Sequence, residues 1–593
     1  MEFEKLALAW SEIEKTSSML EMTRLLAEFF KTVPLEDVDK IVYLSQGSIA
    51  PPYKGVDLGM GEKLAEQALA KSSGYSKEKV ALKFRETGDL GLVAEELLKD
   101  KRQASLFSRK LTIKGVYDSF YKIATSSGTG SQDAKTKRLE ELFNNATPLE
   151  ARYLARFPLG ELRLGIRDAT ILNALSVKET GSKDSKQELE DKYNLHPDLG
   201  EIARLVHSKG INGVKKINIE LGTPIRSALC ERLSTSEEIL EKGNGKVAVE
   251  GKYDGFRLQC HKRGNTVTLF SRQMEDMTRM FPEIVTGIRD QVKAKDAILD
   301  SEALAFDENT KQFHPFQTTM QRRRKHNIEA MAKKYPLKLF LFDVLYLDGK
   351  NVISTPYEER RKLLEKTLKP GDTLLLSERI IAKKPRELTD FFNACIERGL
   401  EGIIAKRLDS PYTPGHREFA WIKLKRDYQQ TLGDTIDVTI VGYYKGKGMR
   451  TQFGLGGLLV AVYSPERDQF LTVSKIGTGF SEELLKQLAE TLGKTTLQHK
   501  PASVESLEKP DEWVQPKYVV TVKAAEITRS SLHTCKRDFD TEGYALRFPR
   551  IIDGIREDKA PEDATTVEEI VQLFNAQKQQ RTAFRTGETE ETA

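Results

Sequence analysis

A lysine beside a turn is the residue of this sequence best placed for nucleophilic chemistry. Lys252 precedes Asp254-Gly255, a dipeptide typical of tight turns between strands, and Arg257 follows on the returning strand. The ordinary pKa of a lysine amine is about 10.4, so the amine attacks only where partial burial and neighbouring cations help to remove its proton. A rigid turn would hold Lys252 for attack, with Arg257 gripping the ligand. The alternative is a plain β-hairpin with an exposed lysine.

Such a nucleophile needs further cations and carboxylates, and the rest of the chain supplies them. Lys423 and Lys425 alternate along one predicted strand, so both face one side and suit a triphosphate. Glu302 and Glu401 belong to two further predicted strands, and their oxygens suit Mg²⁺, a hard cation. The remaining candidates are two arginines, Arg272 and Arg417, and an aromatic residue on a predicted buried strand, Phe342.

Each of these residues also has an ordinary structural explanation. Taken alone, Glu302 fits a salt-bridged carboxylate at a sheet edge, and Phe342 fits a core residue better than a ligand platform. The complete series, in this order along the chain, favours the functional interpretation.

The periodicity of apolar residues divides the chain into regions that must position these side chains. Residues 1–220 repeat apolar positions every three or four residues, which predicts an all-α domain. Residues 221–428 begin at the breaker Gly222-Thr223-Pro224 and predict a mixed α/β domain. Residues 429–576 predict a small Greek-key barrel of the oligonucleotide-binding type, with one helix at 481–492. Residues 577–593 are polar and predict a disordered tail.

Composition and charge exclude several classes of protein. The four cysteines stand far apart with no Cys-x-x-Cys pair, which argues against a disulfide framework and a cysteine zinc site. The net charge of +5 is too small to indicate a nucleic-acid binder by itself. No apolar run is long enough for a membrane span, and the N-terminus lacks the pattern of a secretory signal. We therefore expect an intracellular protein without a membrane partner.

Together the motifs resemble those of the covalent nucleotidyltransferases, which are DNA ligases, RNA ligases and mRNA-capping enzymes. Lys252-x-Asp254-Gly255-x-Arg257 resembles the nucleophile motif of that superfamily. The segments 421–428 and 556–559 are similar to motifs of ATP-dependent DNA ligases. The segments 128–132 and 159–166 are similar to parts of the DNA-binding domain of archaeal and eukaryotic replicative ligases. The resemblance covers nearly the whole chain apart from the tail.

The resemblance implies an ATP-dependent DNA ligase of the replicative type. Its domains would be an all-α DNA-binding domain, a mixed α/β nucleotidyltransferase (adenylation) domain and an OB-fold β-barrel. Its substrates would be ATP and nicked duplex DNA, and its metal would be Mg²⁺. It would be a monomer in the cytoplasm, associated with the nucleoid. It would serve DNA replication, repair and recombination through a lysyl-AMP and an adenylylated DNA intermediate.

The resemblance also implies roles for single residues. Lys252 would attack the α-phosphate of ATP, Phe342 would stack on adenine, and Glu250 would line the nucleotide pocket. Glu302 and Glu401 would bind or orient Mg²⁺, and Glu302 is also a candidate for the ribose. The expected ribose and phosphate contacts are Arg257, Arg272, Arg417, Lys423 and Lys425. The residues expected to orient pyrophosphate when the barrel closes in the first step are Arg556, Asp558 and Lys559.

Two positions depart from the family pattern, and three other classes of protein compete with the ligase hypothesis. Ser301 stands where a glycine is commoner, and 226–229 replaces a more usual Pro-Met-Leu. An NAD-dependent ligase would need a nicotinamide-recognising region and typically a cysteine zinc module, and neither is visible. The long helical region and the 556–559 motif favour DNA over the substrates of capping enzymes and RNA ligases. A non-catalytic DNA-binding scaffold would have no need for Lys252.

A short motif in the helical region predicts a protein partner. Gln103, Leu106 and Phe107 resemble the segment by which archaeal replication enzymes dock on the sliding clamp. One helical turn would bring the three side chains onto one face. The alternative is that Leu106 and Phe107 pack in the core of the protein itself.

Overall fold

The computed structural model describes residues 1–593 except 17, 100–108, 161, 234, 308–311, 315–317, 320, 324–326, 426–434, 447–452, 539–541, 557–558 and 587–593. The chain forms two compact units. The first contains Met1–Glu231, Ile239–Pro385 and Ile404–Ile422, and the second contains Arg232–Glu238, Arg386–Ile403 and Lys423–Ala593. Among the described residues, no helix has both the length and the apolar character that crossing a bilayer requires.

The N-terminal part of the first unit is a helical bundle, as expected. Leu6, Trp10 and Ile13 lie at helical spacing on α1 and are all buried. Thr147 and Glu150 form a reciprocal capping box at the start of α9. The helices are α1 (Phe3–Glu14), α2 (Met19–Thr32), α3 (Val38–Ser45), α4 (Glu62–Ser73), α5 (Lys77–Thr87), α6 (Leu90–Lys99), α7 (Ile113–Thr125), α8 (Ser131–Asn145), α9 (Pro148–Arg156), α10 (Asp168–Thr180), α11 (Lys186–Leu195), α12 (Leu199–Lys209) and α13 (Ile211–Val214).

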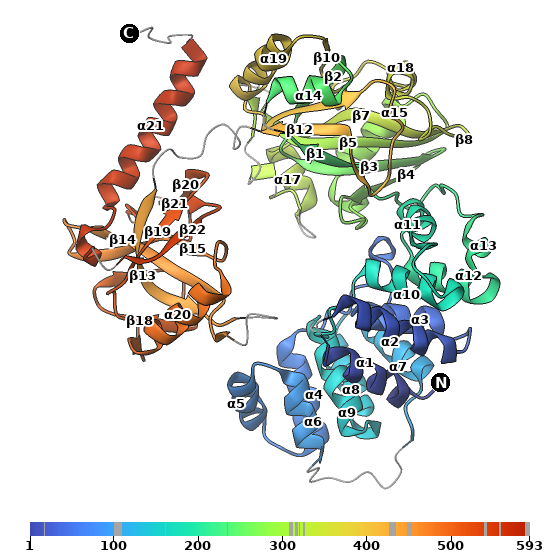
Figure 1. Ribbon diagram of the computed structural model, residues 1–593, viewed down its shortest axis with the longest axis vertical. Coiled ribbons are helices and arrows are strands. Elements are labelled where there is room, and N and C mark those ends of the chain that lie inside the picture. The colour runs from blue at the N-terminus through green and yellow to red at the C-terminus, as the bar shows by residue number, and fades with distance from the viewer. Residues whose placement is uncertain are drawn as a thin grey trace. The chain divides into compact units, whose positions relative to one another are not determined.

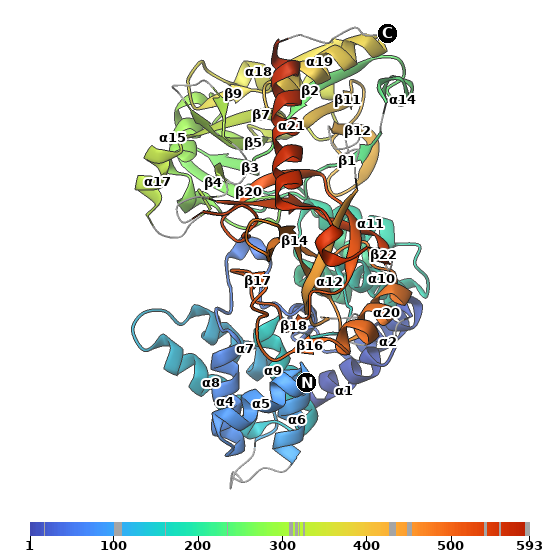
Figure 2. The ribbon, with the colours of Figure 1, turned by 90° about the vertical axis from the view of Figure 1, so that its left-hand side faces the viewer.

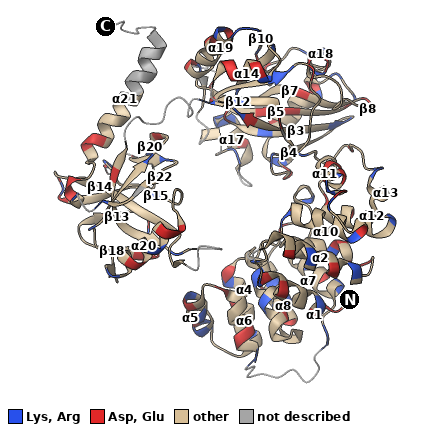
Figure 3. Ribbon diagram, viewed as in Figure 1, with Lys and Arg blue, Asp and Glu red and all other residues tan. Residues whose placement is uncertain are grey.

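Charged residues of both signs share the helices of this bundle. Figure 3 shows Lys and Arg beside Asp and Glu on α5, whose sequence is KEKVALKFRET. The charge of this helix is therefore mixed and not uniformly basic.

A hydrogen-bonded connection joins the bundle to the mixed α/β region, most of which belongs to the first unit. The Gly222 N–H donates to His261 Nδ1 (3.0 Å), and the Ile225 N–H donates to Gln259 Oε1 (2.7 Å). Gln259 Nε2 in turn donates to Ile225 O (3.0 Å). The segment that begins at the predicted breaker is thus bound to strand β3 (Phe256–Arg263) through both side chains and backbone.

Two sheets form the mixed region. One has the strand order β1-β12-β11-β2-β10, and the other has the order β4-β3-β5-β7-β8, with β6 on β5 and β9 on β7. Helices α15 and α18 pack against the second sheet (Figures 1 and 2). The core between α15 and this sheet contains Ile284, Ile288, Leu299 and Leu341.

The mixed region has the following elements, besides β3: β1 (Leu229–Arg232), α14 (Ser236–Lys242), β2 (Val247–Lys252), β4 (Thr266–Ser271), α15 (Pro282–Gln291), β5 (Asp296–Asp307), β6 (Gln312–Phe313), α17 (Ile328–Lys334), β7 (Leu337–Leu347), β8 (Lys350–Asn351), α18 (Tyr357–Thr367), β9 (Leu374–Leu376), β10 (Arg379–Ala382), α19 (Pro385–Glu397), β11 (Gly402–Arg407) and β12 (Arg417–Lys425).

The C-terminal part of the second unit consists mainly of antiparallel strands. Its larger sheet has the order β16-β18-β13-β14-β15-β17, with β19 joining β13 to β22. The predicted helix at 481–492 corresponds to α20, and Leu485, Leu488 and Leu492 pack in the core of this region. The elements are β13 (Ile436–Tyr444), β14 (Gly457–Ser464), β15 (Gln469–Ile476), α20 (Glu482–Gly493), β16 (Thr496–Leu497), β17 (Val504–Glu505), β18 (Glu512–Val514), β19 (Val519–Lys523), β20 (Glu526–Ser530), β21 (Gly543–Arg547), β22 (Arg550–Arg556) and α21 (Val567–Thr586).

Helix α21 continues past residue 576, where the sequence analysis placed the start of a tail. The last part of this helix is rich in Gln, Lys, Arg and Ala, residues with high intrinsic helix propensity. Polar composition alone therefore did not locate the end of regular structure.

Candidate functional site

Lys252 is the last residue of β2, where the chain leaves one sheet for the other. Strand β2 pairs with β10 in the first sheet, whereas β3, just after the turn, pairs with β4 and β5 in the second. The alternative of a plain hairpin across Asp254-Gly255 is therefore wrong. Lys252 is half-buried and ends a strand whose preceding residues are all buried. It stands at a crossover between two sheets.

The turn after Lys252 requires a glycine because there is no room for a side chain. A Cβ atom at Gly255 would collide with Ala303 O and would lie 2.9 Å from Leu304 Cγ. The backbone of the turn thus lies directly against β5. The glycine holds Lys252 close to β5 and does not close a hairpin.

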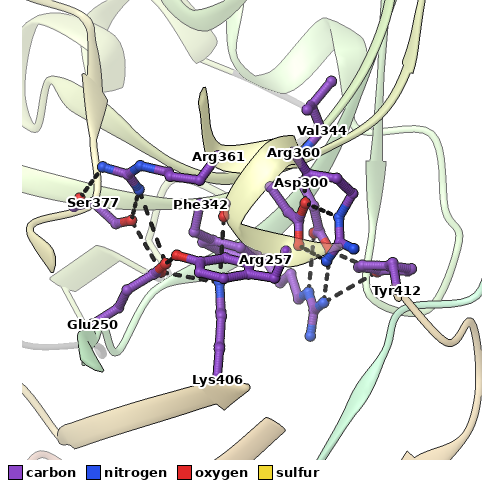
Figure 4. Close-up of polar contacts among 12 residues, drawn as sticks. Glu250, Arg257, Asp300, Phe342, Val344, Arg360, Arg361, Ser377, Lys406 and Tyr412 are labelled. Atoms are coloured by element: carbon purple, nitrogen blue, oxygen red, sulfur yellow. Dashed lines mark hydrogen bonds and ion pairs between the residues drawn. The ribbon is translucent and has the colours of Figure 1, made fainter. Parts of the chain in front are cut away.

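Arg257 lies on β3 in a buried ion pair with Asp300 of β5 (Figure 4). Arg257 Nε and Nη2 donate to the two Asp300 oxygens (3.1 and 2.7 Å), and Nη1 donates to Ala228 O (3.0 Å). The Tyr412 hydroxyl donates to Asp300 Oδ2 (2.7 Å). Burial opposes the charge of Arg257, but Asp300 and Tyr412 outweigh burial and raise its pKa. The sequence singled out Arg257 and missed Asp300 and Tyr412.

Asp300 has a second buried carboxylate as its cross-strand neighbour. The register of β5 and β7 places Asp300 opposite Asp343, and both are fully buried. Like charges in this position repel unless each is neutralised. Arg360 of α18 neutralises Asp343, with Nε and Nη2 at 2.8 and 3.0 Å from its two oxygens. Each carboxylate therefore has its own arginine.

Glu250 lies two residues before Lys252 on β2, so the two side chains leave the strand on the same face. The carboxylate is buried and accepts hydrogen bonds from three side chains. The Tyr357 hydroxyl donates to Oε1, and Ser377 Oγ and Lys406 Nζ each donate to Oε2 at 3.0 Å. The sequence analysis proposed Glu250 as part of the pocket but did not identify these partners.

Helix α18 supplies three of the side chains in this cluster. Tyr357, Arg360 and Arg361 lie at positions i, i+3 and i+4, so they share one face, and all three are buried. Arg361 Nη1 donates to Ser377 Oγ (2.8 Å). A helix that begins YEERRK gives no apolar stripe in sequence, and only its pairing with Glu250, Asp343 and Ser377 explains the burial.

Phe342 lies on β7, half-buried, with its ring edge-on to Trp421 at a centroid distance of 6.0 Å. The guanidinium carbon of Arg257 lies 5.5 Å from the centre of the Phe342 ring, and Lys406 Nζ lies 4.8 Å from it. The aromatic ring thus lies near two cations and a tryptophan, and it joins the Arg257 cluster to the Glu250 cluster.

Glu302 lies on β5, opposite Arg257 of β3 and Phe340 of β7. Burial raises the pKa of its carboxyl to about 7, although the charges of Lys252 and Arg257 act in the other direction. Glu302 and Lys252 are therefore electrostatic neighbours. Arg272 is exposed just after β4, and Arg417 is the first residue of β12.

The remaining strand candidates lie in the second unit. Lys425 at the end of β12 forms an ion pair with Glu401. Lys423 and Lys425 are half-buried while Ile422 and Leu424 are buried, which confirms that the two lysines share a face. A Cβ atom at Gly402 would collide with Leu424 O, so the glycine after Glu401 lets β12 approach. This close packing explains why a glycine, Gly402, follows Glu401.

In the strand-rich region, Arg556 and Lys559 converge on one carboxylate. Lys559 Nζ lies 2.6 Å from Asp437 Oδ2, and Arg556 Nη1 lies 3.7 Å from it. Burial would raise the pKa of Asp437, but Lys559, Thr521 and Arg556 outweigh it and lower that pKa. The third residue of the motif, Asp558, and the docking candidates Gln103, Leu106 and Phe107 lie outside the described residues.

Comparisons with known proteins agree with this architecture. Three family models match the chain: DNA ligase N terminus over residues 2–176, ATP dependent DNA ligase domain over 227–425, and ATP dependent DNA ligase C terminal region over 451–559. A probable DNA ligase of Dictyoglomus turgidum is 47% identical over 584 residues, which cover 98% of this chain and 99% of the relative. The DNA ligase of Nitrosopumilus maritimus is 41% identical over 581 residues, 98% of each chain.

A solved structure named Pmar-Lig_Pre. shares the fold, with a TM-score of 0.55 at 17% identity over 93% of this chain and 99% of that one. The family models and the relatives together define the class of protein. The chain belongs to the ATP-dependent DNA ligase family. It is an enzyme that seals nicks in duplex DNA with ATP, which confirms the resemblance of its motifs.

Proposed function

We propose that Lys252 is the nucleophile of the first step. The uncharged Lys252 amine attacks the α-phosphorus of ATP, a nitrogen–phosphorus bond forms, the bond to the bridging oxygen breaks, and pyrophosphate leaves. The observation that carries this proposal is the placement of Lys252 at the end of a buried strand, held by the glycine turn against β5 and next to Glu302. A lysine fixed by two sheets is positioned at little entropic cost when the nucleotide binds.

The second and third steps transfer the AMP group onward. The 5′-phosphate at the nick attacks the adenylyl phosphorus and releases Lys252. The 3′-hydroxyl then attacks the 5′-phosphorus, forms the phosphodiester bond and expels AMP. Positioning and charge neutralisation govern transfers of this kind more than covalent help does.

The nucleotide is held by residues around Lys252. Phe342 stacks on the base, and the Glu250 carboxylate lines the base pocket. Since the guanidinium of Arg257 is engaged by Asp300 and Ala228, we assign Arg257 to shaping the ribose end of the pocket more than to gripping phosphate. The phosphate contacts are assigned to Arg272, Arg417, Lys423 and Lys425.

Glu302 and Glu401 are the proposed Mg²⁺ ligands. The fit rests on donor chemistry: both carboxylates offer oxygens, and a carboxyl whose pKa burial raises to about 7 gains a favourable counter-charge when a cation binds. Glu401 would exchange part of its contact with Lys425 for the cation. When bound, Mg²⁺ would neutralise negative charge on the phosphates.

Arg556, Asp558 and Lys559 are assigned to the first step, where they would orient pyrophosphate as the barrel domain closes over the nucleotide. Support comes from the side chains of Arg556 and Lys559, which are about one-third exposed (29% and 36%) and share the Asp437 carboxylate. That carboxylate gathers the two cations on one side of the strand-rich region.

The regions correspond to three proposed domains. Residues 1–220 would be the DNA-binding domain, residues 221–428 the adenylation domain and residues 429–576 an OB-fold barrel. Antiparallel strands with one inserted helix, α20, support the barrel assignment. A monomer would bind nicked DNA through phosphates and groove shape, so binding would weaken as salt concentration rises.

A sliding clamp is the proposed protein partner, bound through Gln103, Leu106 and Phe107. The motif itself supports this assignment. Replacing Leu106 and Phe107 by alanine should weaken binding to the clamp in a pull-down and leave AMP loading intact. Clamp binding equal to that of the parent, or misfolding of the variant, would contradict the assignment.

Labelling with α-labelled ATP tests the central proposal. The parent should retain label after denaturing electrophoresis, and Lys252→Ala should not. Lys246→Ala is the matched control, since Lys246 is an exposed lysine just before the same strand. Lys252→Ala should still seal some pre-adenylylated nicks, because the last step needs no nucleophilic lysine. Normal label uptake by Lys252→Ala would refute the assignment.

A further inference from the structure

The buried Glu250 carboxylate has nearly all of its hydrogen-bonding capacity occupied by the protein. A carboxylate accepts about four hydrogen bonds. Tyr357 takes one position on Oε1, and Ser377 and Lys406 take both positions on Oε2. Arg361 Nη1, at 3.9 Å from Oε1, is beyond hydrogen-bond distance. Within the described part of the chain, one acceptor position therefore remains, and it lies on Oε1.

The donors around Glu250 are themselves oriented. Arg361 Nη1 donates to Ser377 Oγ (2.8 Å), so the Ser377 hydroxyl hydrogen must point away from Arg361 and toward Glu250. Burial and the Glu250 charge raise the pKa of Tyr357, so this hydroxyl also remains a donor at neutral pH. All three side chains therefore act as donors, and Glu250 accepts from each of them.

Lys406 links this acidic side chain to the aromatic residue proposed to carry the base. Its ammonium is buried (side chain 1% exposed) and lies 3.0 Å from Glu250 Oε2 and 3.3 Å from the carbonyl oxygen of Phe342. It also lies 4.8, 4.9 and 4.2 Å from the ring centres of Phe342, Tyr357 and Trp421. Figure 4 shows the side chain extending toward Glu250 and Phe342. One ammonium group therefore sets the spacing between the carboxylate and the ring.

We propose that Lys406 is a positioning residue that makes the site select adenine over guanine, an inference that rests on the proposed function. Lys406 holds Glu250 at a set distance from Phe342, so that the remaining acceptor position on Oε1 meets the substituent at position 6 of a purine stacked on Phe342. Adenine carries an amino donor at position 6, whereas guanine carries a carbonyl acceptor there. A fixed carboxylate therefore attracts the first base and repels the second.

The choice of base depends on a Glu250 carboxylate that is held in one position. If Lys406 lost its ammonium, Glu250 would lose one of its three side-chain donors and the link that sets its distance from Phe342. A carboxylate that is free to turn would no longer present Oε1 as a fixed acceptor, so guanine would be rejected less strongly. Loss of Lys406 should therefore relax the choice of base.

The test compares labelling of the full-length protein by α-labelled ATP and α-labelled GTP. Lys406→Met removes the charge and keeps a long apolar side chain. We expect the ratio of ATP to GTP labelling to fall by on the order of tenfold, the scale set by one misplaced hydrogen bond. The KM for ATP in nick sealing should rise more than kcat falls. Lys406→Arg, which keeps the charge, should recover part of the ratio.

Lys262→Met is the matched control, because Lys262 is another buried lysine of the same region. Its ammonium binds the carbonyl oxygens of Val292 (2.5 Å) and Ala294 (2.9 Å). This variant should keep the parental ratio of ATP to GTP. A ratio that falls equally in Lys262→Met would mean that any buried lysine has this effect, and it would overturn the inference.

Ser377→Ala keeps the inference testable if Lys406→Met does not fold. It removes one neutral donor to Glu250 and should lower the ratio by a smaller factor in the same direction. If the parent takes label from ATP and a folded Lys406→Met keeps the parental ratio of ATP to GTP labelling, the inference is overturned and the proposed function stands. If Lys406→Met does not fold, the same result in Ser377→Ala overturns the inference. A parent that takes no label overturns the proposed function and this inference together.

Discussion

Arg257 of β3 and Asp300 of β5 lie diagonally across neighbouring strands, two residues apart in register, and are joined by two hydrogen bonds of 3.1 and 2.7 Å. Asp300 is fully buried, and the side chain of Arg257 is 13% exposed. Neighbouring strands thus present opposite charges close to the Phe342 ring, which belongs to the proposed nucleotide site. Breaking a buried pair by removing one partner is costly because the other charge stays behind without compensation.

Asp300→Asn should therefore destabilise the enzyme by about 3–5 kcal/mol, the usual result of leaving one member of a buried pair. The KM for ATP should rise, because a displaced Arg257 no longer supports the Phe342 ring. Urea unfolding and steady-state nick sealing measure the two effects. Asp290→Asn, at an exposed position on α15, is the control and should match the parent. Parental stability of Asp300→Asn would show that the pair contributes nothing measurable.

Glu302→Gln and Glu401→Gln should raise the Mg²⁺ concentration needed for half-maximal self-adenylylation. Each change removes a negative charge and keeps the shape of the side chain. We expect this Mg²⁺ concentration to rise at least roughly tenfold, because loss of a group that supports a metal site weakens metal binding by about that factor. Metal titration of AMP loading measures the shift. Glu329→Gln, an exposed carboxylate of α17, should leave the curve unchanged. Superimposable curves for Glu302→Gln and the parent would point to a ribose contact or a structural role.

Arg556→Ala and Lys559→Ala should slow self-adenylylation more than they slow the sealing of pre-adenylylated nicks. In the proposed function, both residues place positive charge toward pyrophosphate, which leaves only in the first step. Rapid-quench measurements of the two half-reactions separate the effects. Lys494→Ala, an exposed residue after α20, serves as the control. If the two variants load AMP normally and fail on pre-adenylylated nicks, their role lies in DNA binding.

The buried His261 should make the enzyme sensitive to mild acid. Burial lowers the pKa of this ring to about 3, and the charge of Arg263 acts in the same direction. In the unfolded chain the ring titrates near its ordinary pKa of about 6.5. Between these values the unfolded state binds the extra proton, so stability falls as the pH falls from about 6.5 toward 3.

His261→Gln removes this titration and also removes the hydrogen bond that the Gly222 N–H donates to the ring. The variant should be less stable than the parent at pH 7.5, and the gap in Tm should narrow as the pH is lowered toward 4.5. Carboxylates titrate in both proteins, so their effect cancels in the difference. A gap that stays constant across this range would mean that His261 is not the group responsible.

The sequence by itself was sufficient for the class of enzyme and for the succession of a helical, a mixed and a strand-rich region. Local spacing carries this information, because the three- and four-residue repeat of α1 and the alternation of Lys423 and Lys425 follow from the geometry of a single element. The order of short motifs along the chain was likewise readable without any contact between them.

Only the tertiary structure decided how Lys252 and its neighbours are held. Asp254-Gly255 has the sequence of a hairpin turn, yet it links two different sheets because β5 lies against Gly255. Glu250 meets Lys406 across 156 residues, and Arg360 of a highly charged helix is buried against Asp343. Such pairs have no local pattern. A buried charge becomes stable only when folding brings its partner to it, so the partner must be found in space.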